Sequence, residues 1–402
     1  MNELASLGVI LLLALLAGHV VKFFRVPEVT GYILAGVLLG PAGISLITHE
    51  AVESLQVFSE VALGLILFAI GAVFEIVRFR RIGRRVATLT ALESLLAATF
   101  VTGGLLAVGQ PLIVALLLGV IAMETAAAST LMVMRECNAA GPLSETLSGI
   151  IALNNIFCLT GFLFVAAGFD LHRQAAAAGM GWEVLYRTLY PLLWQIVGSA
   201  ALGFLVGVLL AVWASQVGEH GEMLILLVGA ILLTVGAAQV LELSPLIATL
   251  SVGATMVNLS GESRRVFDAL AQTDPPLYAI FFVIAGADLN VGLLPSLGLV
   301  GLIYVLGRAA GKLFGTLVAT RRTAAEPQVR RYLGYAMLSQ AGLAVGLLLA
   351  VNRRFPELAP LITTVVLAAV TIFELVGPIG ARYALVRAGE ARPQPPVTGL
   401  ID

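Results

Sequence analysis

Charged residues are scarce in this chain: Asp, Glu, Lys and Arg make up only 12% of its 402 residues, while 59% are hydrophobic. A soluble protein of this length has too little interior to bury so much apolar surface, so a soluble globular fold is excluded. The net charge of −1 leaves no basic excess for a nucleic-acid partner. The two cysteines, Cys137 and Cys158, suggest neither a disulfide framework nor a metal site. No nucleophile–base pair stands out, so we expect neither an enzyme nor a cofactor.

Apolar runs near twenty residues in length recur from one end of the chain to the other, which predicts an all-α polytopic protein in a lipid bilayer. We expect about 13 transmembrane helices, over residues 4–24, 29–48, 55–77, 86–108, 111–134, 143–168, 188–215, 222–241, 244–259, 275–289, 296–319, 332–351 and 359–386. Most Lys and Arg residues fall in the loops on one side, including 78–85 and 321–331. By the positive-inside rule, the N-terminus lies outside and the C-terminus in the cytoplasm of a bacterial-type inner (plasma) membrane.

The expected helices divide into two halves, residues 1–168 and 222–388, joined by the helix at 188–215. An odd connecting helix inverts one half relative to the other, so we predict two inverted six-helix repeats. After a transmembrane domain over 1–389, residues 390–402 are expected to form a disordered cytoplasmic tail. The loop at 169–187 is the longest external connection.

Polar residues interrupt two helices that occupy equivalent places in the two halves. The first interruption holds Glu124, Thr125 and Ser129, and the second holds Ser339 and Gln340. Paired interrupted helices mark the substrate site of many transporters, because half-helix ends and unwound carbonyls coordinate ions. The next helix after the first interruption carries the adjacent amides Asn154 and Asn155. Adjacent helical residues point about 100° apart, so one of the two is expected to face an ion and the other to bond a neighbouring helix.

Several charged residues lie inside expected helices. Arg308 and Lys312 are four residues apart and therefore share one helix face. We expect Glu374 to anchor one of these two bases, and Glu60 and Glu93 either to pair with a base or to face a wet crevice. Glu124 has two open interpretations: an ion pair with Arg308 or Lys312, or a functional carboxylate.

A family resemblance rests on six segments that follow one another along the chain: FRVPEVTGYILAGVLLGP, FSEVALGLILFAIGAVFE, LSPLIATLSVGATMVN, IFFVIAGADLNV, GRAAGKLFG and ITTVVLAAVTIFELVGPIGARYALVRAGE. Together they resemble the bacterial monovalent cation:proton antiporters, in the branch of NapA-type sodium/proton exchangers and glutathione-gated potassium efflux systems. The resemblance implies a core domain with crossed broken helices, over 111–168 and 332–386. It also implies a dimerisation domain and a homodimer, for which we expect Gly36 and Gly40 to permit close helix approach at the interface.

The chain departs from the family at the ion-binding motif. Where that motif carries aspartate, this sequence has Asn154 and Asn155, which do not titrate, and Glu124 stands where the family has a small uncharged residue. We therefore expect Glu124 to exchange a sodium or potassium ion for a proton, with oxygens of Thr125, Ser129 and one asparagine as further ligands.

The absence of a basic residue between Arg265 and Arg308 leaves the tenth helix without the lysine of electrogenic members, which predicts electroneutral exchange. Two alternatives remain open. The protein is a transport-inactive sensor or scaffold, or it carries an organic anion on the same fold.

Overall fold

The computed structural model describes residues 3–392 apart from 25, 48, 179–185, 187–189, 192, 290–291, 293 and 296–297. Within that part of the chain every regular element is helical, as the composition predicts. The elements are α1 (Glu3–Phe23), α2 (Glu28–Leu39), α3 (His49–Gly71), a 3-10 turn (Ala72–Phe74), α4 (Ile76–Ala107), α5 (Leu112–Ile121), α6 (Ala127–Glu136), α7 (Pro142–Ala178), a π-helical turn (Trp194–Gly198), α9 (Ser199–Ala214), α10 (His220–Val240), α11 (Pro245–Leu259), α12 (Ser263–Asp288), α13 (Gly298–Arg322), α14 (Pro327–Ala336), α15 (Gly342–Arg354) and α16 (Ala359–Arg387).

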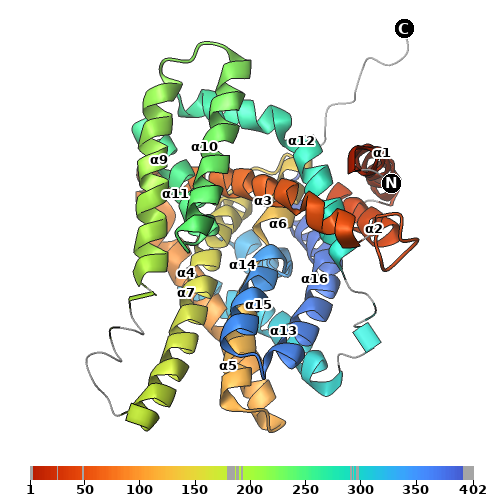
Figure 1. Ribbon diagram of the computed structural model, residues 1–402, viewed down its shortest axis with the longest axis vertical. Helices are drawn as coiled ribbons and strands as arrows, with labels where there is room; N and C mark the ends of the chain where they lie inside the picture. The colour runs from red at the N-terminus through yellow and green to blue at the C-terminus, as the bar shows by residue number, and fades with distance from the viewer. Residues whose placement is uncertain are drawn as a thin grey trace.

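Six helical segments of the described chain are long and apolar enough to cross a membrane, and shorter apolar helices accompany them. Figure 1 shows α9 and α10 along one edge of the molecule and α1 and α2 at the opposite edge. The short helices α6, α14 and α15 lie between these edges, in the middle of the bundle (Figure 1). Polar groups on the short helices are therefore surrounded by apolar helices, so their partners must come from the protein itself.

Both predicted interruptions are present. The segment expected at 111–134 is split into α5 and α6 by residues 122–126, and α14 and α15 are separated by residues 337–341. Ala126, at the end of the first break, has extended backbone angles. The chain therefore leaves its helix in the middle of the bundle rather than at the bundle surface.

Glycines permit the closest helix contacts. A Cβ atom on Gly311 of α13 would lie 2.7 Å from Cα of Ala97 on α4, and one on Gly315 would lie 3.1 Å from Cα of Glu93. This close packing holds the α4 and α13 backbones together, so the charged residues of the two helices meet.

The prediction that Gly36 and Gly40 line a dimer interface is wrong. A Cβ on Gly36 would lie 2.1 Å from the carbonyl oxygen of Val283, and one on Gly40 would lie 2.7 Å from Cα of Ala287. Both glycines therefore face α12 of the same chain. The small residues do permit close approach, but the partner helix is internal.

Two predicted loop boundaries differ from the structure. Residues 78–85, expected as a loop, belong to the first turns of α4, which begins at Ile76. Helix α7 continues to Ala178 and takes up much of the expected loop at 169–187, whose residues 179–185 and 187–189 lie outside the described chain. A helix can continue beyond the apolar core of the membrane into a charged segment. Hydropathy therefore marks the ends of such helices poorly.

The predicted tail begins too early at residue 390. The carboxylate of Glu390 is buried and accepts hydrogen bonds from the backbone N–H groups of Leu143 (2.6 Å) and Ser144 (2.7 Å) at the start of α7. The N–H of Arg392 donates to the carbonyl of Cys137 (2.9 Å). A carboxylate that caps a helix start is stabilised by the free N–H groups there, so residues 390–392 belong to the folded domain. Residues 393–402 of the expected tail lie outside the described chain.

Candidate functional site

The two helix breaks touch each other. The N–H of Ala126 donates to the carbonyl oxygen of Ser339 at 3.1 Å, which joins the first break to the second. The side-chain amide of Gln340 donates to the carbonyl of Ile121 (3.1 Å) and to the hydroxyl of Tyr304 (2.7 Å). The broken helices therefore cross at this point, and side chains satisfy backbone groups that each helix leaves open where it ends.

Arg308 of α13 binds carbonyl oxygens of both breaks. Its guanidinium donates to the carbonyls of Leu338 (2.7 Å), Ser339 (2.9 Å) and Glu124 (2.6 Å), and it lies over the ring of Phe373 at 4.3 Å. The last carbonyls of a helix carry partial negative charge, so a buried cation there stabilises both half-helix ends at once. Arg308 thus holds the crossing together.

Lys312, one turn further along α13, pairs with Glu93 of α4. Its ammonium lies 3.0 Å from a carboxylate oxygen of Glu93, and both side chains are buried. The ammonium also donates to the carbonyl of Met123 and to the hydroxyl of Thr125 (2.9 Å). Glu93 accepts a further bond from the side-chain amide of Asn154 at 2.7 Å. Both charges of this buried pair are therefore stabilised by each other and by further hydrogen bonds.

Glu124 differs from Glu93. Its side chain is only 1% exposed, and one carboxylate oxygen accepts a single bond, from the N–H of Ala341 at 3.2 Å. Arg308 binds the backbone carbonyl of Glu124 rather than its carboxylate, and Lys312 pairs with Glu93. The ion pair considered for Glu124 is therefore absent from the described residues, and its carboxylate lies at the crossing without a salt-bridge partner.

The structure also corrects the expectation for Glu374. This residue of α16 is 3% exposed, and its Oε2 atom has no hydrogen-bond partner within the described protein. The predicted anchoring of Arg308 or Lys312 by Glu374 is wrong, because both bases are bound to the helix breaks and to Glu93. Of the two remaining acids, Glu93 is paired, whereas Glu60 is exposed and accepts from the amide of Gln239 at 2.9 Å.

The predicted polar ligands lie in different surroundings. Thr125 lies in the break rather than on a helix, so it does not share a helix face with Ser129 of α6, and its hydroxyl is bound by Lys312. Asn154 makes the expected bond to a neighbouring helix, since its amide also donates to Ser94 at 2.9 Å. Asn155 is half-buried and donates only to the carbonyl of Ile151 on its own helix.

Buried oxygen atoms without a hydrogen-bond partner in the described chain gather around the crossing. They belong to Ser129, Asn154, Ser339, Gln340 and Glu374. Leaving such an oxygen unpaired at membrane depth costs roughly 1–3 kcal/mol. Oxygen atoms are the ligands that hard cations prefer, so this set is suited to a dehydrated monovalent cation.

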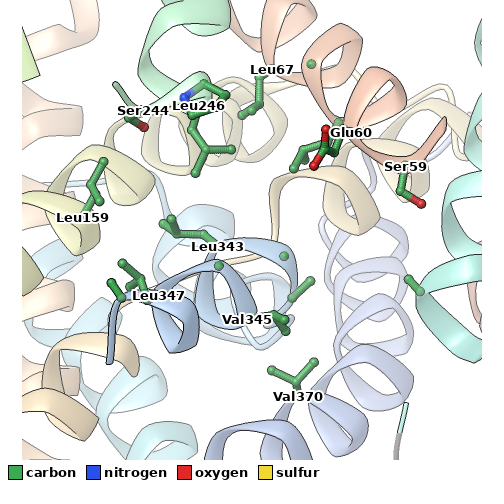
Figure 2. Close-up of a pocket in the computed structure, with 18 of the residues that line it drawn as sticks. Ser59, Glu60, Leu67, Leu159, Ser244, Leu246, Leu343, Val345, Leu347 and Val370 are labelled. Carbon is green, nitrogen blue, oxygen red and sulfur yellow. The ribbon is translucent and has the colours of Figure 1, made fainter. Parts of the chain in front are cut away.

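A cavity of about 850 Å³ leads to the crossing. Figure 2 shows Leu343, Val345 and Leu347 of α15 on one side, with Ser59 and Glu60 of α3 on the other. The cavity also reaches Ala341 and Gly342 at the second break and Glu374 on α16. Most of its wall is apolar, and among the residues that the structure describes its charged lining consists of Glu60, Asp288, Glu374 and Arg354. Acids outnumber bases, so the cavity favours cations over anions.

Sequence reasoning placed Arg308 and Lys312 among the supporting charges of this site but missed what Lys312 means for the charge balance. It looked for the base of electrogenic members in the tenth helix, whereas Lys312 enters the site from the following helix, α13, four residues after Arg308. The argument for electroneutral exchange from a missing lysine therefore loses its basis. Asp288 at the end of α12 was also missed as a cavity residue, although its place at the end of the segment IFFVIAGAD was the available signal.

These features define a class of protein: a helical membrane protein with two crossed, broken helices around a buried charged site. A family model described as "Sodium/hydrogen exchanger, transmembrane" matches residues 8–380. The chain therefore belongs to the sodium/hydrogen exchanger family and is a multi-pass membrane protein. The resemblance predicted from its sequence segments is confirmed.

The chain is also similar to two individual proteins. The chain is 23% identical over 317 residues to the ammonium/H(+) antiporter subunit AmhT of Alkalihalophilus pseudofirmus, a match that covers 78% of each protein. It is 33% identical over 91 residues to the iron transporter MagA of Paramagnetospirillum magneticum. That second match covers 23% of this chain and only 20% of the relative.

Solved structures of similar fold include two of the sodium proton antiporter MjNhaP1 from Methanocaldococcus jannaschii. The first, at pH 8, aligns with a TM-score of 0.69 at 16% identity and covers 96% of this chain and 98% of that one. The second, from electron microscopy, aligns with a TM-score of 0.74 at 16% identity and covers 97% and 99%. At this identity the likeness shows the fold alone.

Proposed function

We propose that this protein is a secondary active transporter that exchanges a monovalent cation, sodium or potassium, for protons at the crossing of its broken helices. Glu124 is the exchanging carboxylate. The observation that carries this proposal is that Glu124 lies buried at the crossing with one backbone hydrogen bond and, among the described residues, no salt bridge. A buried carboxylate without a counter-ion is stable only if it binds a proton or a cation, and exchange is the alternation of these two states.

The surroundings of Glu124 support this role. Arg308 and Lys312 are held by carbonyl oxygens and by Glu93, so neither base competes with a transported cation for the carboxylate. Unpaired oxygens of Ser129 and Ser339 supply ligands of the right kind near the crossing. Because Glu93 and Lys312 neutralise each other, Glu124 is the titrating group of the exchange step. We therefore keep electroneutral exchange, one cation for one proton, as part of the proposal.

The proposal includes the finer architecture: 13 transmembrane helices in two inverted repeats, with the N-terminus outside. On this topology the cavity opens to the outside, because it is lined by the C-terminal ends of α10 and α12, the start of α11, and α15. Cysteine labelling tests the orientation. Residues 321–331 should react from the cytoplasmic side and residues 170–187 from the outside, and labelling of both from one side would contradict the helix count.

A homodimer also remains a proposal, with its interface away from Gly36 and Gly40 because these face α12. Cross-linking in membranes tests it, and a protein that runs only as a monomer under cross-linking would exclude it.

Ammonium is a further monovalent cation to test, because one relative is named an ammonium/H(+) antiporter subunit. The organic-anion alternative is disfavoured by the acidic cavity, whose charged lining is Glu60, Asp288 and Glu374 against Arg354. A sensor without transport would show no flux with any of these cations.

The decisive experiment is proton flux in proteoliposomes with sodium, potassium, lithium and ammonium supplied separately. Wild-type protein should exchange at least one cation, without response to an imposed membrane potential. Glu124→Gln should abolish exchange while leaving the elution profile and Tm unchanged. The matched control is Glu222→Gln, which changes an exposed glutamate of α10 and should transport normally. A Glu124→Gln protein that exchanges at the wild-type rate would falsify the assignment of the site.

A further inference from the structure

Glu374 is a buried acid that the exchange at Glu124 does not use. It lies in the middle of α16, is 3% exposed, and takes part in no ion pair within the described chain. Its Oε2 atom also has no hydrogen-bond donor there. An ionised carboxylate in this state is costly at membrane depth, so the residue must hold a proton or a cation to be stable.

The position of Glu374 indicates which ligand reaches it. Glu374 lines the 850 Å³ cavity together with Glu60 and Asp288, and Arg354 is the base in that lining. The net charge of the wall attracts cations and repels anions. The cavity is far larger than one alkali cation, so an ion can enter with part of its water shell and lose it at the inner wall.

Glu374 and Glu124 both lie near the second helix break. The cavity wall includes Ala341, whose N–H donates to the carboxylate of Glu124. One turn along α16, Gly377 packs against Ser339, whose hydroxyl oxygen is buried and unpaired. A path with oxygen ligands therefore runs from the cavity past Glu374 to the crossing.

We infer that Glu374 is a second cation-binding carboxylate, which receives a dehydrating monovalent cation from the cavity and passes it to Glu124. This inference rests on the proposed exchange function, and it adds a binding step that precedes the exchange. Its physical requirement is that the two acids are not both ionised and empty at once, because two negative charges buried near the same helix break in a low-dielectric site repel each other. Entry of a cation at Glu374 relieves that repulsion.

The first test is sided transport kinetics. Glu374→Gln should raise the KM for the cation at least tenfold when the cation is supplied from the cavity side, and leave the KM from the opposite side within twofold. Glu374→Asp keeps the charge and should recover part of the affinity, and Glu222→Gln serves as the control. A purely structural role predicts instead a lower Tm and equal effects from both sides, and that result would overturn the inference.

The second test measures binding without transport. Sodium chloride, compared with choline chloride, should raise the Tm of the purified Glu124→Gln protein, because Glu374 still binds sodium. The Glu124→Gln, Glu374→Gln double variant should lose this shift. If the double variant keeps the full shift, Glu374 is not a binding group. If Glu124→Gln still transports while Glu374→Gln loses the sided affinity, the proposed role of Glu124 fails and that of Glu374 stands.

Discussion

Glu93 and Glu124 are both buried beside the crossing of the broken helices, yet their surroundings are opposite. Glu93 has an ammonium at 3.0 Å and an amide at 2.7 Å, whereas Glu124 has one backbone N–H at 3.2 Å. Glu93 is therefore fixed by a counter-ion and an amide, and the exchange proposed for Glu124 meets no bound base at its carboxylate. Burial alone does not identify a functional acid, and the number of partners around the carboxylate separates the two kinds.

The largest effect should follow from breaking the compensated pair. Lys312→Met leaves Glu93 buried without its counter-ion, and the removal of one partner from a buried ion pair costs about 3–5 kcal/mol. We expect a large fall in Tm and in the yield of folded protein in detergent. The double variant Glu93→Met, Lys312→Met should recover most of the stability, since it removes both charges. A single variant as stable as wild type would show that Glu93 and Lys312 do not depend on each other.

The next largest effect concerns the packing of α16 against the second helix break, near Glu124. A Cβ on Gly377 of α16 would lie 2.2 Å from the hydroxyl oxygen and 2.4 Å from Cα of Ser339, so Gly377→Ala must displace the second break. Overpacking of this kind costs roughly 1–3 kcal/mol, and exchange should fall further than stability because the crossing moves. Gly236→Ala on α10 is the control, because a Cβ there meets nothing within 4 Å. Equal transport by the two variants would contradict the tight crossing.

Asn154 and Asn155 differ in the same way as Glu93 and Glu124, in the number of partners that their side chains contact. Asn154→Asp places a second carboxylate against Glu93 and removes the amide donor, so it should lower the free energy of unfolding by about 1–3 kcal/mol. Asn155→Asp should leave stability nearly unchanged, because that side chain is half-buried and bonds only its own helix. If Asn155 faces the ion, its aspartate should also shift the pH profile of exchange. Thermal melts and flux at several pH values check both variants, and a more stable Asn154→Asp protein would refute this role for Asn154.

Much of this architecture follows from local sequence. Apolar length predicts membrane helices, and polar residues among alanines predict the two breaks at 122–126 and 337–341, because these signals depend on neighbours along the chain. Charge pairing depends instead on how helices far apart in sequence pack. Gly311 and Gly315 allow α13 to pack against α4, and Lys312 therefore pairs with Glu93. The base that we expected to pair with Glu374 is bound elsewhere for this reason. The wrong prediction for Gly36 has the same cause. Its small size predicts that another helix approaches closely, but the sequence does not show which helix that is.

The smallest effect concerns Glu326, which lies in the loop before α14, outside the membrane-spanning segments. Its carboxylate pairs with Arg85 of α4. Arg85 donates to Oε1 of Glu326 at 3.0 Å, and this hydrogen bond lowers the pKa of the Glu326 carboxyl below its ordinary value of 4.5. The side chain is 43% exposed, and pairs of this kind contribute only about 0–1 kcal/mol. The Arg85–Glu326 pair is thus a solvent-exposed ion pair, in contrast to the buried pair of Glu93 and Lys312.

The sign of its pH dependence follows from the direction of the pKa shift. Because the folded-state pKa is lower than the unfolded one, the pair stabilises the protein fully above about pH 4.5, and this stability is lost as the pH falls through the lowered value. The Tm difference between wild type and Glu326→Gln should be constant at neutral pH and should narrow on acidification. Added salt should reduce it as well, since an exposed pair is screened. A difference that widens in acid would mean that Glu326 is stabilised in its protonated form, contrary to its contact with Arg85.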